Sequence, residues 1–176
     1  DRLHEAAARL GATAVVTDVT HEEDCNAIVA SHVAVHGGLD VLVNSAGIGM
    51  AATIADTTSK RFDVQLAVNL RGAFAFARVA LRTMGAYGRG AIVLVTPLAG
   101  TVRLLPGAEA ASATTAGAHG LTRALARAGG PHGVHHELGA LGGVVVGGDR
   151  AVHQGGIAVG VHDGDDRDAE LAGLVD

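Results

Sequence analysis

Segments with helical periodicity alternate with short apolar runs over residues 1–126, and this alternation restricts the fold more than any other feature of the chain. The apolar runs at residues 14–16, 39–43 and 90–95 are largely continuous and do not alternate with polar residues. Continuous runs are typical of strands that are buried on both faces of a sheet. Strands that alternate with helices predict an α/β fold with a doubly wound, mainly parallel, Rossmann-like sheet that helices cover on both faces.

The helices are predicted from apolar residues that recur every 3.6 positions and from signals at the helix ends. The first helix ends at Gly11, and the second begins near Thr20 and continues to about His36. Two longer helices are predicted over residues 61–84 and 112–128. Because the first helical pattern has already begun at the start of the sequence, we expect the fold to be truncated at its N-terminus.

The length of 176 residues corresponds to a single domain. Residues 1–128 form its predicted α/β core. Residues 129–176 are rich in glycine, which offers few side chains for packing and costs much backbone entropy on folding. We expect this C-terminal part of the same domain to be the least ordered, with short elements only at residues 144–146 and 168–175.

The composition argues against several kinds of partner. The net charge is −5 and the 13 Lys and Arg residues are scattered, so we expect no basic surface for nucleic acid. The single cysteine, Cys25, excludes an intrachain disulfide and a cysteine-rich zinc site, which fits a reducing compartment. No apolar run approaches the roughly 20 residues that a membrane helix needs. We therefore expect a cytoplasmic protein without a nucleic-acid or membrane partner.

Short motifs follow one another in a characteristic order along the predicted core. Thr-Asp-Val ends the first strand at residues 17–19, Val-Asn-Ser-Ala-Gly ends the next at 43–47, and Val-Asn-Leu-Arg-Gly lies in the long helix at 68–72. Gly-Ala-Ile-Val at 90–93 leads to Leu-Ala-Gly at 98–100, and His-Gly-Leu-Thr-Arg-Ala-Leu-Ala follows at 119–126. In this order the motifs resemble the short-chain dehydrogenase/reductase family over residues 1–128, in particular members of the 3-oxoacyl-carrier-protein reductase type.

The resemblance implies an NAD(P)-dependent oxidoreductase that acts on a small carbonyl compound or a secondary alcohol. Ligands of doubly wound sheets bind at the carboxyl ends of the strands, where Asp18 and Asn44 are predicted. By resemblance, Asp18 and Val19 hold the adenine ring of NAD or NADP, and the ribose side is lined by Asn44, Ser45, Ala46 and Gly47. A turn that needs small residues, or an aspartate that caps a helix, would explain the same residues without a cofactor.

Asn69 lies inside the predicted helix at 61–84, where asparagine is mildly unfavourable because its side chain competes with the backbone. In the resembling family this residue opens a kink in the helix and positions a water for proton relay, so Asn69 is the catalytic candidate. A surface asparagine on a helix is the alternative. The family also implies a homo-oligomer formed through the helices at 61–84 and 112–128.

The catalytic serine, tyrosine and lysine of the family are missing from this chain. Their places are taken by Pro97, Ala111 and Thr115. The chain has one tyrosine, Tyr87, and one lysine, Lys60, so a Tyr-x-x-x-Lys pair cannot occur anywhere in it. Since the loss of a general acid typically lowers a rate about 10²- to 10⁴-fold, we expect at most trace activity.

The cofactor side also departs from the family pattern. The Gly-rich turn that places pyrophosphate on a helix N-terminus belongs to a βαβ unit that should precede Asp1, so we do not expect tight binding of NAD or NADP by this chain alone. Leu141 and Gly142 stand where the family has Pro-Gly, and Glu137 stands in place of an asparagine. These differences put the nicotinamide contacts in doubt.

Other chemistries have less support. A cluster of histidines could hold zinc, but Pro131 and Gly133 argue against the helix that would bring the ligands together, so we expect loop histidines and no metal site. The cluster consists of His132, His135, His136 and Glu137. Residues 162–166 lack the spacing of a calcium loop, and no G-x-S-x-G elbow of a serine hydrolase occurs. Two hypotheses remain: an impaired oxidoreductase, or a catalytically inactive relative or fragment that acts as a structural partner subunit.

Overall fold

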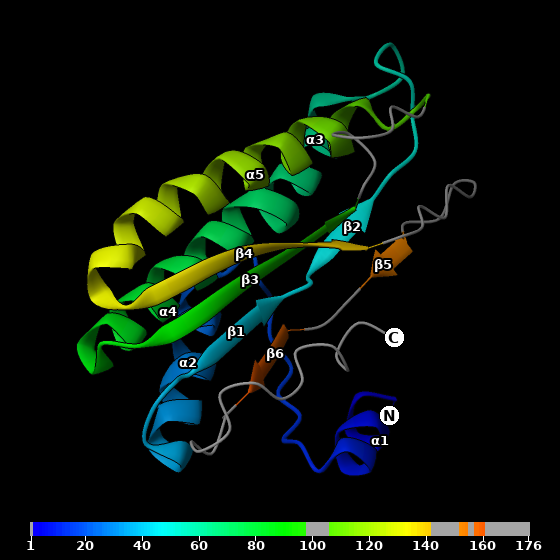
Figure 1. Ribbon diagram of the computed structural model, residues 1–176. Helices are drawn as coiled ribbons and strands as arrows, with labels where there is room; N and C mark the ends of the chain where they lie inside the picture. Colours follow the sequence, from blue (N-terminus) through cyan, green and yellow to red (C-terminus); the bar gives the residue numbers. More distant parts are fainter. Residues whose placement is uncertain (1, 98–105, 142–151, 155–156, 161–176) are drawn as a thin grey trace.

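Three parallel strands form the centre of the molecule. The computed structural model describes residues 2–97, 106–141, 152–154 and 157–160, and Figure 1 shows their arrangement. The main sheet has the strand order β4-β3-β1-β6. Its parallel members are β1 (Val41–Asn44), β3 (Gly90–Pro97) and β4 (Val134–Leu141). This parallel sheet confirms the predicted α/β class and two of the predicted strands, and it adds β4 directly after the turn residues near Pro131.

Strands β4, β5 (Val152–Gln154) and β6 (Ile157–Gly160) all follow residue 128, so the expectation of elements only at 144–146 and 168–175 in this part of the chain was wrong. Strand β6 pairs antiparallel with the other edge of β1, so β1 is flanked on both sides. Strands β2 (Gly47–Gly49) and β5 form a separate antiparallel pair. Because β2 begins only three residues after β1 ends, the short turn between them lies at the carboxyl end of β1.

The helices agree with the sequence periodicity to within a few residues. They are α1 (Arg2–Leu10), α2 (Glu22–His36), α3 (Ser59–Leu66), a π-helical turn η1 (Ala67–Gly72), α4 (Ala73–Tyr87), α5 (Glu109–Gly129) and a 3₁₀ turn η2 (Gly130–His132). The segments α3, η1 and α4 form the single long helix predicted around residues 61–84. The first helix is followed by Gly11 with φ 65°, a left-handed conformation that glycine adopts without strain.

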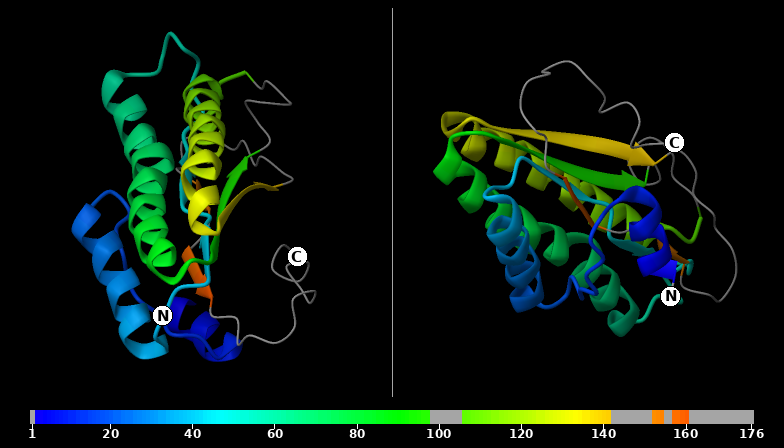
Figure 2. Two further views of the ribbon diagram at one scale, coloured as in Figure 1. Left: turned by 60° about the vertical axis from the view of Figure 1, so that its left-hand side comes forward. Right: turned by 90° about the horizontal axis from the view of Figure 1, so that it is seen from below.

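The described helices that cover the sheet lie on one face of it, whereas the sequence analysis expected helices on both. Figure 2 shows α2, α4 and α5 on the same side of the strands. Both crossovers, from β1 through α4 to β3 and from β3 through α5 to β4, step in the same direction along the sheet. Right-handed crossovers that step in one direction place their helices on one face, which explains the arrangement.

The core lies between this face and the helices. Phe76 and Met84 of α4 are fully buried against Leu42 of β1 and Ile92 and Leu94 of β3, which are at most 1% exposed. By length and composition, the continuous helix Ser59–Tyr87, which contains an 18-residue window with a mean hydropathy of 1.2, could also cross a membrane, although the sequence analysis expected no such segment. Its buried residues pack against the sheet, as in the core helix of a globular domain.

The strand predicted at residues 14–16 is absent, and this prediction was wrong. The backbone of these residues makes no ladder, and the side chains of Val15 and Val16 are 43% and 80% exposed. A strand forms only where an adjacent strand accepts and donates its hydrogen bonds. The edge of β1 that does not pair with β3 pairs with β6, so it is not available to residues 14–16. The β propensity of Val15 and Val16 is therefore not sufficient to form a strand, because no neighbouring strand pairs with them.

Several predictions concern residues outside the described part of the chain. They are the motif at residues 98–100, the strand at 144–146, the acidic turn at 162–166 and the final helix at 168–175.

Candidate functional site

The carboxyl end of β1 carries a tight turn built by Asn44. Its side chain is 4% exposed, and its Oδ1 accepts a hydrogen bond from the Ala46 N–H at 3.1 Å. This bond, from residue i to residue i+2, is an Asx turn, which fixes the local backbone without help from distant residues. Ser45, Ala46 and Gly47 are partly exposed around it, so the predicted cofactor turn presents small side chains and backbone at this end of the sheet.

Asn69 joins three elements at the site. Its Oδ1 accepts a hydrogen bond from the Ile48 N–H at 2.8 Å, and its Nδ2 donates to the Ile48 carbonyl oxygen at 2.9 Å. The same Nδ2 donates to Thr114 Oγ1 of α5 at 3.3 Å. Asn69 lies within the π turn η1, so the helix irregularity implied by the family occurs at this residue. The side chain thus holds β2 and α5 to the long helix.

Gly47 lies next to the Asn69 side chain. A Cβ atom built on Gly47 would lie 3.6 Å from Asn69 Oδ1, which is an ordinary van der Waals distance. The turn that Asn44 stabilises is therefore in direct contact with Asn69 through Gly47.

Thr114 is a site residue that the sequence analysis did not single out. It is 1% exposed, and its hydroxyl donates to the Ala111 carbonyl oxygen at 2.9 Å while it accepts from Asn69. Nearby, a Cβ on Gly117 would lie 2.7 Å from Leu70 Cδ2, so α5 and η1 pack closely. A threonine three residues after an alanine gives no signal in the sequence, because its partner Asn69 is 45 residues away.

Asp18 and Val19 lie in the loop before α2. Asp18 Oδ1 accepts hydrogen bonds from the Thr20 N–H at 2.8 Å and from the Thr20 hydroxyl at 2.7 Å, and these bonds lower the pKa of the Asp18 carboxyl. The exposed Asp18 therefore stabilises a local turn with Thr20, which is the role that the sequence analysis weighed against adenine binding. Val19 lies against η1: a Cβ on Gly72 would be 2.9 Å from both Val19 Cγ2 and the Val19 carbonyl oxygen. This contact links the loop to the helix that carries Asn69.

The three positions of the missing catalytic residues are on α5 and β3. Ala111 is partly exposed in the first turns of α5, and Thr115 is buried at 4% exposure. Pro97 ends β3 and pairs in register with Leu141. Tyr87 and Lys60 do not replace them, because these residues lie near the two ends of the helix Ser59–Tyr87, about 40 Å apart at 1.5 Å per residue.

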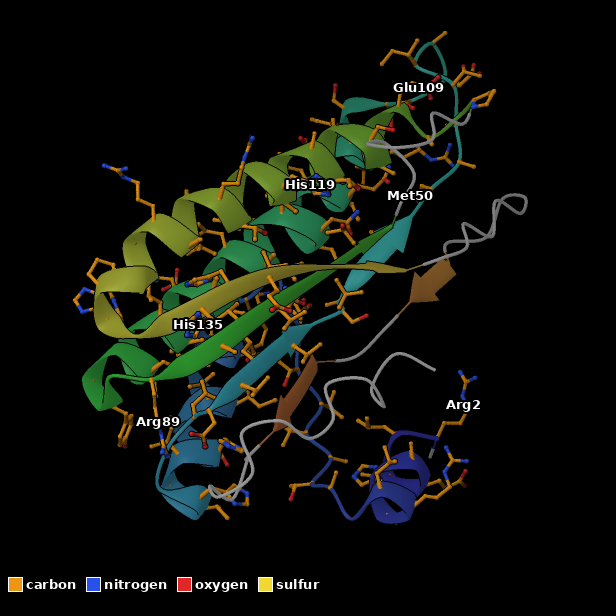
Figure 3. The ribbon with its side chains drawn as sticks, in the orientation of Figure 1. Arg2, Met50, Arg89, Glu109, His119 and His135 are labelled. Carbon is orange, nitrogen blue, oxygen red and sulfur yellow. The ribbon has the colours of Figure 1, made fainter. Side chains whose placement is uncertain are left out.

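The segment after β2 is joined to the residues directly before α5. The Ala52 N–H donates to the Gly107 carbonyl oxygen at 3.0 Å, which ties the two segments together. Figure 3 shows Met50 at the end of β2 and Glu109 at the start of α5 at this end of the molecule, with Arg89 near the opposite end of the sheet. The site is thus at the carboxyl ends of the strands, where parallel sheets bind ligands.

Two of the clustered histidines lie on strand β4 and not in a loop, so the expectation of loop histidines was wrong for them. His135 and His136 are neighbours on β4, so their side chains point to opposite faces of the strand. Both ring nitrogens of His136 are buried without a hydrogen-bond partner, and burial lowers the pKa of this imidazole. The described part of the chain contains no group of three or more His, Cys, Asp or Glu side chains suited to a metal ion.

The chain is similar to known oxidoreductases in sequence. Residues 1–137 match the family described as enoyl-(acyl carrier protein) reductase. An uncharacterized oxidoreductase of Mycobacterium bovis is 40% identical over 104 residues, a match that covers 57% of this chain and 42% of the relative. The 2-(R)-hydroxypropyl-CoM dehydrogenase of Xanthobacter autotrophicus is 36% identical over 115 residues, which cover 64% of this chain and 46% of the relative. The chain therefore spans less than half the length of these two curated relatives.

The fold is similar to that of solved dehydrogenases. A short chain dehydrogenase from Mycobacterium smegmatis superposes with a TM-score of 0.74 at 34% identity, and the match covers 79% of this chain and 60% of that structure. The structure described as ElxO with NADP bound gives a TM-score of 0.65 at 30% identity and covers 69% of this chain and 49% of that one.

Proposed function

Since this chain belongs to the short-chain dehydrogenase/reductase family, we propose that its site is that of an NAD(P)-dependent oxidoreductase acting on a small carbonyl compound or a secondary alcohol. The observation that carries the proposal is the contact of Asn69 with both Ile48 and Thr114, which joins the turn after β1 to α5. The NADP-bound relative supports a nicotinamide cofactor of the same kind.

The residues around the turn fit a flat dinucleotide. Ser45, Ala46 and Gly47 are small and partly exposed, so the backbone lies open to a ligand, while Asn44 stabilises the turn from inside. Asp18 has a lowered pKa and remains an anionic acceptor suited to an adenine amino group. These residues would hold the adenine and ribose parts, and a bound nicotinamide would supply hydride transfer.

The proton-transfer side of the site is impaired. Ala111 and Pro97 carry no ionisable or donating side chain, and the buried Thr115 cannot supply the positive charge of a lysine. A missing general acid lowers a rate by about 10²- to 10⁴-fold, so the proposed activity of this chain is weak. Asn69 acts in it as a positioning residue, because its side-chain amide is fully engaged with Ile48 and Thr114.

A second candidate function is that of a catalytically inactive partner subunit. It is favoured by the absence of a Tyr-x-x-x-Lys pair together with apolar side chains on the outer surface of the long helix, where Val64 is 43% and Phe74 is 49% exposed. In this case the helices Ser59–Tyr87 and α5 would form the interface of a homo-oligomer. Sedimentation velocity of the wild-type chain and of Phe74→Asp distinguishes a monomer from an oligomer held by this face.

Binding of NADH and NADPH to the purified chain, measured by calorimetry, tests the first proposal. The Asp18→Ala substitution removes a hydrogen bond to a charged acceptor, worth about 1.5–3 kcal/mol, so affinity should fall roughly 10- to 150-fold. The exposed Asp63→Ala on α3 is the matched control and should leave the affinity unchanged. A thermal melt of each variant shows whether the loss of the Thr20 contacts has unfolded the loop.

Restoring the missing pair tests the chemistry. The Ala111→Tyr, Thr115→Lys double variant should raise the rate of NADH oxidation with a panel of ketones at least tenfold above either single variant, because the two residues act as a unit. Saturable cofactor binding without any gain in turnover would favour the inactive partner subunit. No binding by a folded chain would mean that the family relationship does not extend to cofactor use.

A further inference from the structure

The side chain of Gln65 is a buried amide without a partner. Gln65 is 1% exposed, and neither its Oε1 nor its Nε2 has a hydrogen-bond partner among the described residues. Buried polar side-chain atoms in native proteins nearly always have a partner, either in the protein or in an ordered water. Gln65 is therefore a group whose partner lies outside the described chain.

Gln65 faces the seam in which Asn69 lies. The two residues are four positions apart on one continuous helix, so their side chains project from the same face, one turn apart. Asn69 points between β2 and α5, where it bonds Ile48 and Thr114, and α3 contacts both of these elements. The Gln65 amide is thus buried one turn nearer to the start of the long helix, beside the candidate site.

The register of the two helices places the first turn of α5 nearest to the turn that carries Gln65. Asn69 is in contact with Thr114, and Leu70 is in contact with Gly117, so the two helices run in the same direction along the seam. One turn before Thr114, α5 carries Ala110 and Ala111.

The start of α5 adds backbone donors to this first turn. The residue preceding α5, Ala108, provides no side-chain cap. The first N–H groups of a helix have no intrahelical partner, so donors in this turn also need an acceptor.

We propose that the seam between α3, β2 and the first turn of α5 is a binding site for a single O–H group held by Gln65. An O–H group has two acceptor lone pairs and one donor. The lone pairs would accept hydrogen bonds from Gln65 Nε2 and from an N–H group at the start of α5, and the proton would be donated to Gln65 Oε1. A neutral group matches the neutral amide of Gln65, which would not compensate the charge of a buried ion. Water supplies the O–H group in the free chain, and the hydroxyl of a small alcohol supplies it when one binds.

The site is independent of hydride transfer. It rests on the burial of Gln65 and on the packing of α3 against α5, so its failure would leave the proposed oxidoreductase function untouched. If both hold, an alcohol hydroxyl is recognised within one helical turn of Ala111, the position at which the family has its phenol donor.

Nuclear magnetic resonance of the wild-type chain tests the proposal directly. The chain has only two glutamines, Gln65 and Gln154, so the side-chain amide of Gln65 is assigned by its disappearance in Gln65→Met. We expect this amide to show cross-relaxation with a long-lived water. The Asn69 amide is the internal control and should show none, because both of its protons are donated within the protein.

Titration with 2-propanol distinguishes the two sources of the O–H group. A saturable shift of the Gln65 amide, absent from the exposed Asn26 amide, identifies an alcohol hydroxyl, whereas an unshifted amide with its water contact intact identifies water as the resident group. Either result supports the site. A Gln65 amide without water contact and without a shift, together with a higher melting temperature of Gln65→Met, would overturn the proposal, since the amide would then be an unsatisfied group that costs stability.

Discussion

Asn69→Ala should destabilise the fold through the backbone of Ile48. The substitution removes the acceptor of the Ile48 N–H at 2.8 Å and the donor to the Ile48 carbonyl oxygen at 2.9 Å, together with the weaker bond to Thr114. A typical intramolecular hydrogen bond contributes about 0.5–1.5 kcal/mol net, and a buried group left without a partner costs about 1–3 kcal/mol. Because Ile48 is partly buried, we expect a loss of about 2–4 kcal/mol in the free energy of unfolding.

The assay is urea unfolding followed by circular dichroism, with hydrogen exchange of the Ile48 amide as a local readout. For a domain of this size, 1 kcal/mol corresponds to a shift of about 2–4 °C in melting temperature, so the variant should melt roughly 4–16 °C lower. The matched control is Asn26→Ala, the same substitution on the exposed surface of α2, which should change stability by less than about 0.5 kcal/mol.

The local readout separates this explanation from a general loss of packing. In Asn69→Ala the Ile48 amide should exchange much faster, while amides of β3 retain their protection relative to the global stability. If Asn69→Ala were as stable as Asn26→Ala, or if Ile48 kept its protection, the inference that Asn69 holds β2 to the long helix would be refuted.

Three further perturbations probe the packing of the chain. Gly72→Ala places a Cβ 2.9 Å from the Val19 carbonyl oxygen and should cost about 1–3 kcal/mol in urea unfolding, whereas the control Gly120→Ala, with open space at its Cβ, should gain about 0.5–1 kcal/mol. Burial lowers the pKa of His136 below 6.5 in the folded chain, so this group should not reduce the free energy of unfolding above pH 6.5 and should reduce it as the pH falls below 6.5. His136→Leu should therefore flatten the dependence of the urea midpoint on pH. An unchanged dependence would contradict the assignment. His32, whose pKa burial also lowers, should contribute with the same sign. Burial raises the pKa of the Cys25 thiol to about 11, so at pH 8 its reaction with a disulfide reagent should be about a hundredfold slower than that of the urea-unfolded chain, and equal rates would show that Cys25 is accessible.

Local patterns predicted the elements whose stability depends on their own residues. The helical period and the end signal at Gly11 predicted α1, and the periodicity around residues 61–84 and 112–128 predicted the two long helices. The strand at residues 14–16 failed for the opposite reason. Its valines have β propensity, but a strand needs a neighbour, and β1 is paired with β3 and β6.

In the candidate site, too, local motifs could be predicted and contacts between distant residues could not. The strand ends predicted that Asp18 and the turn at residues 44–47 face one crevice, because the carboxyl ends of parallel strands lie on the same edge of a sheet, and the resemblance added Asn69 as the catalytic candidate. The sequence did not predict Thr114 or Gln65 as neighbours of Asn69. Thr114 lies 45 residues from Asn69, and the burial of Gln65 depends on how closely α5 approaches α3.

The sequence by itself determined the α/β class, the positions of the long helices and the absence of a Tyr-x-x-x-Lys pair, since periodicity and composition are properties of neighbouring residues or of the chain as a whole. Only the tertiary structure decided that Asn69 bonds both backbone groups of Ile48 and that Gln65 is buried without a partner among the described residues. The physical reason is that hydrogen-bond partners and burial depend on distances of a few ångströms between elements, and these distances are set when the helices pack against the sheet.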